Sequence, residues 1–253
     1  MRKRTQIIYP IVIDRRIRYF LMIDTETCNT INHNGKLDMS NVLVYDIGLA
    51  VVDKRGKVYL QKSFIVKDIF FGMQDLMQSA YYSNKIPQYL NDIAEGKREV
   101  ASWYEVVMAI KEICEVFKIK TVVSHNARFD DNALKITQRY NTCSKFRFTL
   151  PYGVEYYDTL KMAKDTICKQ KGYIKFCEQN GYMTKHKKPQ PRATAEILYR
   201  YITGNNEFVE SHTGLEDCLI EAKIMAHCYR QHKKMRKALY KESAEPQGER
   251  KRL

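Results

Sequence analysis

Residues 19–28 read YFLMIDTETC, and this stretch determines the fold that we expect for the chain. Its first five residues are all apolar, which is typical of a short, fully buried strand. The strand ends on Asp24, and a second carboxylate, Glu26, follows two positions later. Because side chains two apart on a strand project to the same face, the two carboxylates can hold one hard cation between them. A pair of this kind is also common as an ordinary salt bridge or a solvated pair.

Two more strands are expected directly after this one. Residues 43–52 and 57–66 form apolar, strand-like runs, and the turn at residues 53–56 (DKRG) joins them. The three runs together predict a three-stranded antiparallel opening of the sheet.

Helices then alternate with strands. Ser102 and Glu105 form a capping-box pattern before a helix with a core-facing stripe, and Thr213 and Glu216 repeat the pattern before the last long helix. Between these helices we expect buried strands at residues 121–123 and 154–157, a helix from about residue 129 to 139, and a helix from Asp158. The predicted fold is therefore an α/β mixed sheet, with three antiparallel strands followed by parallel strands and with helices on its faces.

Further carboxylates stand at the ends of predicted elements. Asp130 follows a buried strand, and Asp217 lies in the first turn of the last helix. Either one could be a helix N-terminal carboxylate that is stabilised by the helix dipole. Asp158 is better explained as the cap of the helix that follows it, and we place it outside the site.

His212 lies one residue outside the last helix if Thr213 is the N-cap. On this connecting segment its ring can reach over a site that Asp217 anchors, as a mobile base would. Five residues within a helix would instead turn the ring well away from the Asp217 face.

The charge of the chain points to a polyanionic partner. It has 43 Lys and Arg against 29 Asp and Glu, a net charge of +14 and a pI near 9.3. Each end of the chain carries +5, so the body carries only +4. We predict a basic N-terminal arm at residues 1–17, a catalytic domain at 18–232, and a basic, partly disordered tail at 233–253.

Several protein classes are excluded by composition. No stretch approaches the roughly 20 apolar residues of a membrane span. Residues 1–18 lack a small-residue cleavage site, so we expect a cytoplasmic protein. The seven cysteines and six histidines form no recognisable set of zinc ligands, which argues against a structural zinc protein.

Three segments, DTE at 24–26, HNARFD at 125–130 and HTGLED at 212–217, resemble the three motifs of the DEDDh family of 3'→5' exonucleases. The family includes proofreading subunits of replicases and has an RNase H-like fold. The resemblance covers about residues 18 to 232. Residues 80–82 (AYY) and 148–153 (FTLPYG) are also similar to phage-encoded members.

The resemblance implies a two-metal mechanism with Mg²⁺ or Mn²⁺ as cofactors. Asp24, Glu26 and Asp217 would hold one cation, Asp24 would bridge to a second, and Asp130 would act through water. His212 would take the proton of the attacking water.

The implied substrate is the single-stranded 3' end of DNA, which is shortened by release of 5'-mononucleotides; a DNA polymerase is a further implied partner. Three alternatives stay open: RNA ends, small oligonucleotides, and a catalytically inactive module that only binds nucleic acid. The basic loop at residues 184–192 is either a solvated loop or a track for the phosphate backbone. The residues expected to contact nucleic acid are Thr25, Thr27, Asn126, Phe129, Tyr81, Tyr82, Lys185, Lys187, Lys188 and Arg192.

Overall fold

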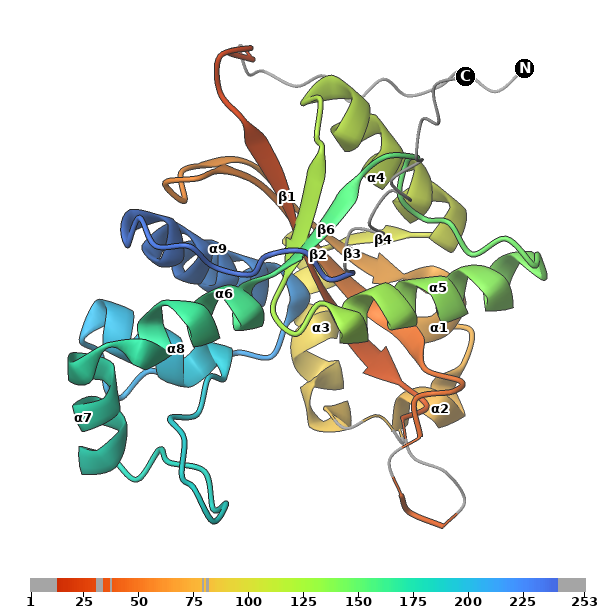
Figure 1. The fold of residues 1–253 in the computed structure, drawn as a ribbon. Helices are drawn as coiled ribbons and strands as arrows, with labels where there is room; N and C mark the ends of the chain where they lie inside the picture. The colour runs from red at the N-terminus through yellow and green to blue at the C-terminus, as the bar shows by residue number, and fades with distance from the viewer. Residues whose placement is uncertain (1–12, 31–33, 37, 79, 81, 241–253) are drawn as a thin grey trace, which may run out of the picture.

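A six-stranded mixed sheet forms the centre of the molecule (Figure 1). This computed structural model describes residues 13–30, 34–36, 38–78, 80 and 82–240. The strand order is β4-β3-β2-β1-β5-β6. The strands are β1 (Tyr19–Cys28), β2 (Leu43–Asp53), β3 (Val58–Val66), β4 (Glu99–Ala101), β5 (Thr121–Ser124) and β6 (Glu155–Asp158).

The strand directions agree with the predicted topology. β1, β2 and β3 pair in antiparallel fashion. β5 pairs with β1 and β6 with β5, both in parallel. β4, which we did not expect, adds a parallel strand beside β3. Its three residues are too few to show an alternating pattern in the sequence.

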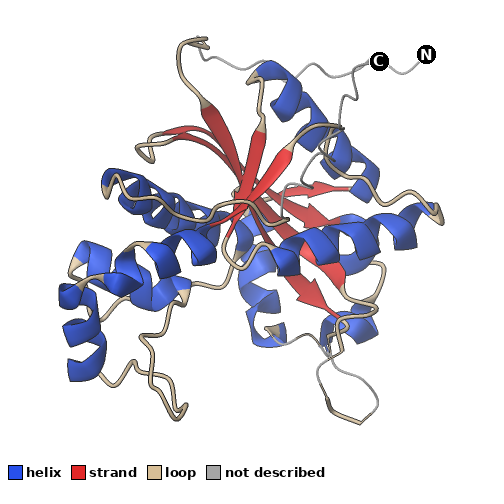
Figure 2. Cartoon of the chain, in the orientation of Figure 1, coloured by secondary structure: helices blue, strands red, loops and turns tan. Residues whose placement is uncertain are grey.

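Helices cover both faces of the sheet, as Figure 2 shows. One group comprises α1 (Lys67–Phe70), α2 (Gln74–Gln78), α3 (Ile86–Ala94), α4 (Trp103–Val116) and α5 (Arg128–Thr142), together with the 3₁₀ turn η1 (Ser83–Lys85). The other comprises α6 (Thr159–Asp165), α7 (Lys171–Gln179), α8 (Ala195–Thr203) and α9 (Gly214–Arg230), together with η2 (Ile167–Lys169).

The alternation of side chains along β1 divides the interior into two apolar cores. Tyr19, Leu21 and Ile23 belong to the core that contains residues of α1 to α5. Phe20 and Met22 belong to the core that contains residues of α6 to α9. Because this strand is covered on both faces, its apolar run is continuous rather than alternating. Asp24 and Glu26 follow Met22 at intervals of two residues, so their side chains lie on the same face of β1, the face on which α9 packs.

The predicted helix starts were accurate in two cases. Ser102 and Glu105 form the capping box of α4, with both reciprocal hydrogen bonds present. Asp158 caps α6 by accepting a hydrogen bond from the backbone N–H of Leu160 at 2.9 Å. α5 runs from Arg128 to Thr142, longer than expected. The helices α1, α2, α3, α7 and α8 were not predicted; α1 and α2, with four and five residues, are too short to show a helical period.

Part of the predicted basic tail packs against the body. The backbone N–H of Leu239 donates to the carbonyl of Tyr156 at 2.7 Å, and Ala238 forms a bridge with Tyr157. Leu239 is buried in the first core. Residues 237–239 therefore line the edge strand β6, whereas residues 241–253 of the tail and residues 1–12 of the arm lie outside the described residues. Among the described helices, none is long and apolar enough to cross a membrane.

Candidate active site

The three motifs meet at one cavity of about 750 Å³. It opens where the parallel strands β1 and β5 end, which is the usual position of a ligand site in an α/β sheet. All five predicted catalytic residues line it, namely Asp24, Glu26, Asp130, His212 and Asp217. Elements far apart in the sequence thus bring four carboxylates and one imidazole together.

Asp24 and Glu26 lie near the end of β1. The register of β1 against β2 shifts immediately after Glu26, so the strand keeps its alternation through both carboxylates. Burial raises the pKa of Asp24 well above its usual value, and the nearby carboxylates of Glu221, Asp130 and Asp217 raise it further. Burial likewise raises the pKa of Glu26, with a smaller opposing effect from Lys85. The protein itself therefore does little to compensate these charges.

Asp130 is held in place by the strand that carries the first motif. Its Oδ1 accepts hydrogen bonds from the backbone N–H of Thr25 at 3.1 Å and from the Thr25 hydroxyl at 2.8 Å. Burial raises the pKa of Asp130 to about 7, although the hydrogen bonds from Thr25 act in the opposite direction. One oxygen of this carboxylate is thus oriented by the chain.

The start of α9 corrects one of our predictions. Thr213 is the N-cap, as expected, but its side chain makes no capping hydrogen bond to the helix backbone. Its hydroxyl instead donates to Glu216 Oε2 at 2.7 Å. The predicted capping box of Thr213 and Glu216 is therefore wrong, because the two side chains bond to each other and not to the backbone N–H groups of the first turn.

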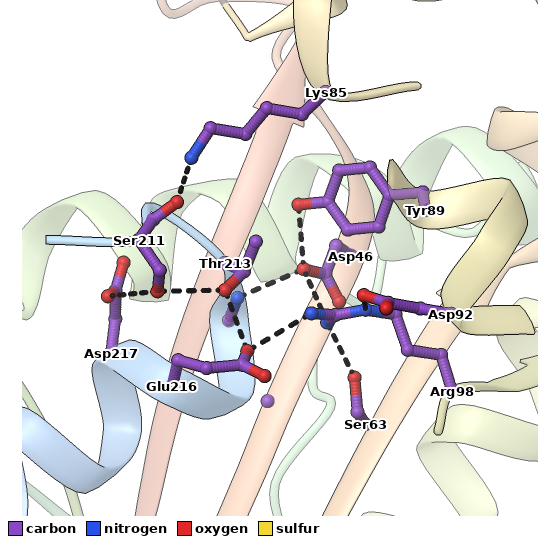
Figure 3. Close-up of polar contacts among 12 residues, drawn as sticks. Asp46, Ser63, Lys85, Tyr89, Asp92, Arg98, Ser211, Thr213, Glu216 and Asp217 are labelled. Carbon is purple, nitrogen blue, oxygen red and sulfur yellow. Dashed lines mark hydrogen bonds and ion pairs between the residues drawn. The ribbon is translucent and has the colours of Figure 1, made fainter. Parts of the chain in front are cut away.

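A buried ionic cluster takes over the capping role (Figure 3). Asp46 of β2 accepts a hydrogen bond from the backbone N–H of Gly214 at 2.9 Å and another from the Tyr89 hydroxyl at 2.9 Å. Arg98 contacts Asp46 at 3.4 Å and Glu216 at 3.1 Å. The first turn of α9 is thereby fixed to the sheet, with Asp217 facing the cavity.

Two glycines allow α9 to approach the sheet this closely. A Cβ atom added to Gly48 of β2 would lie 2.1 Å from the carbonyl carbon of Gly214. A Cβ added to Gly214 would lie 2.5 Å from the backbone nitrogen of Gly48. Since the obstructing atoms belong to the backbone, neither clash can be relieved by a side-chain rotation.

His212 lies just outside α9, as predicted, with a left-handed backbone at φ 49°. Its ring stacks on Tyr82 with the centroids 4.7 Å apart and 16° between the planes. Lys85 donates to the carbonyl oxygens of Ser211 and His212 and so holds this segment. Burial and the positive charge of Lys85 lower the pKa of His212 below its usual 6.5. The imidazole is therefore neutral at neutral pH.

The donor set fits a divalent cation. Ligand atoms of Glu26, His212 and Asp217 all lie within 4.8 Å of one another. Burial raises the pKa of Asp217 to about 8, and Glu210 adds to this effect. Carboxylate oxygens are the donors that Mg²⁺ and Mn²⁺ prefer. A bound cation would remove the cost of crowding these negative charges together.

Sequence reasoning missed three charged residues at the site. Glu221 is buried and lines the cavity, and Glu210 lines it next to His212. Burial and Glu196 raise the pKa of Glu210 to about 7. A signal for Glu221 was present, because it follows Asp217 by four residues and thus shares its helix face. Nothing in the sequence pointed to Lys85.

Only some of the residues predicted to contact nucleic acid line the cavity. Asn126, Phe129 and Tyr82 line the cavity, and Phe129 is half-buried there. Thr25 also lines it, but its hydroxyl is committed to Asp130. Thr27 is buried and is not among the residues that line this cavity. Tyr81 lies outside the described residues.

The basic loop folds back beside the cavity. The backbone N–H of Thr184 donates to the carbonyl of Gln190 at 2.8 Å, and Met183 forms a bridge with Pro191. Arg192 lines the cavity, together with Thr184, Gln190 and Pro191. Lys185, Lys187 and Lys188 are exposed farther along the loop.

Comparison with solved structures supports the fold. No protein-family model matches the chain. No curated protein sequence matches it either. Solved structures do match: a full-length 3'-exonuclease aligns at 10% identity with a TM-score of 0.56, covering 91% of this chain and 93% of the other.

Two more structures extend this likeness. The nuclease domain of 3'hExo, a DEDDh family member bound to rAMP, aligns at 11% identity and TM-score 0.50, covering 89% of this chain and all of that domain. E. coli exonuclease I in complex with a 5cy-dT13 oligonucleotide aligns at 12% identity and TM-score 0.50, covering 85% of this chain and 41% of the other. The chain therefore has the RNase H-like α/β fold of 3'-exonucleases, the fold that its motifs predict.

Proposed function

We propose that this protein is a two-metal-dependent 3'→5' exonuclease that releases 5'-mononucleotides from single-stranded 3' ends of DNA. One observation carries the proposal: Asp24, Glu26, Asp130 and Asp217 line one cavity together with His212. These residues come from three segments that the fold, rather than the sequence, brings together. The similarity of the fold to 3'-exonucleases supports the same reading.

Each residue has a defined task in this proposal. Asp24, Glu26 and Asp217 would hold one divalent cation, Asp24 would also hold a second, and Asp130 would act through water. Divalent cations in this site would supply a hydroxide at neutral pH and stabilise charge on the leaving 3'-oxygen. His212 accepts the proton of the water, and the stack on Tyr82 orients its ring for this transfer.

The role of His212 predicts an acid limb in the pH profile. The base must be neutral when the reaction starts, and its pKa is lowered from 6.5. We therefore expect activity to be high at neutral pH and to decline only below about pH 6.5. A flat profile through this range at saturating metal would contradict the assignment.

RNA is the second candidate substrate, because the solved structures include both kinds of complex. One similar structure is described as a 3'-exonuclease that recognises a histone mRNA stem-loop, with TM-score 0.53 at 11% identity, whereas exonuclease I is bound to a DNA oligonucleotide. The two substrates differ in the 2'-hydroxyl of the terminal ribose. Digestion of both is therefore part of the test.

The decisive experiment is digestion of 3'-labelled and 5'-labelled single strands of DNA and RNA with Mg²⁺, Mn²⁺ or EDTA. We expect stepwise shortening from the 3' end, no activity in EDTA, and no activity for Asp217→Ala. Release from the 5' end, or activity that survives EDTA, would falsify the proposal. Binding without digestion by the wild-type protein would favour the inactive binding module instead.

A further inference from the structure

Glu221 is a buried acid that none of the three motifs contains. It lies in α9 one helical turn after Asp217, and the two side chains share a face of the helix. Only 3% of Glu221 is exposed, yet it lines the same cavity as Asp24 and Asp130. The helix thus delivers two carboxylates to the site rather than one.

One oxygen of this carboxylate lacks any partner within the described part of the chain. Glu221 Oε2 is fully buried and makes no hydrogen bond there. The neighbouring charges are all of the same sign, since Asp130, Asp217 and Glu210 each raise the pKa of Glu221 beyond the effect of burial. Only a hydrogen bond from the backbone of His125 acts in the opposite direction.

The electrostatic neighbours place Glu221 on one side of the site. Among the charged neighbours of Asp24, Glu221 has the largest effect on its pKa, and Asp130 has the next largest. The pKa of Glu26 is raised by Asp46, Asp217 and Asp130, and Lys85 opposes them. Glu221, Asp24 and Asp130 are therefore close neighbours in the lining of the cavity.

A buried carboxylate without a compensating charge destabilises the folded protein, as does a buried ion pair that has lost one partner. A divalent cation offsets this cost when the carboxylate is one of its ligands. We propose that Glu221 is a fifth carboxylate of the metal site, which binds through Oε2 the divalent cation shared by Asp24 and Asp130. This inference rests on the proposed function and adds a ligand that the three motifs do not contain.

The test is calorimetric titration of Mn²⁺ into the wild-type protein, Glu221→Gln and Glu178→Gln. Glutamine keeps the shape and removes the charge, and Glu178 is an exposed acid of α7 that provides the matched control. We expect two Mn²⁺ in the wild type and the control. In Glu221→Gln the weaker of the two should lose about tenfold to a hundredfold in affinity.

A melting experiment separates a ligand from a merely structural residue. In EDTA, Glu221→Gln should melt at the same temperature as the wild type or higher, because one repelling charge is gone. With saturating Mn²⁺ its gain in melting temperature should be smaller than that of the wild type. A lower melting temperature in EDTA with unchanged Mn²⁺ affinity would overturn the inference.

The two proposals fail in different ways. If the wild type digests DNA and binds two Mn²⁺ while Glu221→Gln binds both equally well, only the role of Glu221 is wrong. If the wild type binds no Mn²⁺, the proposed function fails as well. Should Glu221→Gln not fold, Glu221→Met, which is similar in size and has no carboxylate, is titrated, and a Mn²⁺ affinity equal to that of the wild type would reject Glu221 as a ligand.

Discussion

Two buried carboxylates near α9, Asp46 and Glu221, have opposite surroundings. Asp46 contacts Arg98 at 3.4 Å and accepts hydrogen bonds from Tyr89 and Gly214. Asp46 Oδ1 and Glu221 Oε2 are both buried without a hydrogen bond among the described residues, but the charged neighbours that shift the pKa of Glu221 are acids. The protein thus compensates the first charge with its own cation and leaves the second for a ligand. The difference separates an acid that holds the fold from an acid that serves the site.

The same distinction applies to the predicted metal ligands. Burial raises the pKa of Asp46, but the charge of Arg98 opposes this effect. For Asp24 every neighbouring charge that contributes is negative and acts with burial. Buried charges without a partner occur where a protein binds a cation, and a perturbed pKa at such a place marks a functional site.

The largest effect is expected for Asp24→Asn, which alters a buried carboxylate without a compensating positive charge. Loss of this ligand should remove several kcal/mol of transition-state stabilisation, or about a thousandfold or more in rate. The melting temperature in EDTA should not fall, because the substitution relieves repulsion. Single-turnover digestion of a labelled strand and thermal melting measure the two effects. A variant that keeps its activity but has a lower melting temperature would show that Asp24 stabilises the fold, as Asp46 does, and does not serve the reaction.

The next largest effect is expected for Arg98→Met, which removes the positive charge that compensates Asp46. It leaves Asp46 buried without its cation, which should destabilise the fold by about 3–5 kcal/mol. Chemical denaturation measures the loss. Arg236→Met is the control, because Arg236 pairs with Asp165 at the surface, where loss of an ion pair has little effect on stability. Equal losses in the two variants would remove the distinction between Asp46 and Glu221.

A pH titration of stability compares the two kinds of buried acid without any substitution. The pKa values of Asp130 and Asp217, about 7 and about 8, are raised from 3.8. The stability they contribute is therefore full below pH 3.8 and is lost as the pH rises through these values.

In EDTA we thus expect the melting temperature to rise by several degrees as the pH falls from about 8.5 to about 6.5. Below that range the lowered pKa of His212 acts in the opposite direction, since charging it destabilises the folded state. Asp217→Asn should flatten the rise. A melting temperature that falls over this interval would mean that the carboxylates are compensated after all.

The smallest effect is expected for Tyr82→Leu, which removes the ring that stacks on His212. The stack on His212 contributes about 0.5–1.5 kcal/mol beyond area burial, so activity should fall about twofold to tenfold. Stopped digestion assays at pH 7 and pH 6 measure it. Tyr104→Leu, which alters an exposed tyrosine of α4, is the control and should leave the rate unchanged. A loss as large as that of Asp24→Asn would assign Tyr82 a larger role than orienting the ring.

The central strands and the five motif residues could be predicted from the sequence because their signals are local. The two-residue period along β1 places Asp24 and Glu26 on one face, and the start of α9 at Gly214 follows Thr213. The order of the three motifs, through its resemblance to the exonuclease family, predicted that Asp130, His212 and Asp217 join Asp24 and Glu26 in one site. These signals need no knowledge of distant contacts.

The rest could not be predicted, because it depends on residues that only the fold brings together. The capping box of Thr213 failed because its hydroxyl donates to Glu216, whose carboxylate also binds Arg98 from 118 positions away. Lys85 reaches His212 from 127 positions away. The spacing of Glu221 from Asp217 is visible in the sequence, but its burial and its missing partner are not.

The close approach of Gly48 and Gly214 has a consequence for evolution. Both nearest obstructions are backbone atoms, so an alanine at either position would push α9 off β2 and carry Asp217 and Glu221 away from Asp24. A homologous chain could then keep every acidic residue of the three motifs and still be inactive as a nuclease. Two residues that have no side-chain chemistry thus decide whether the motifs describe an enzyme, and a survey of homologues should inspect them before it assigns activity.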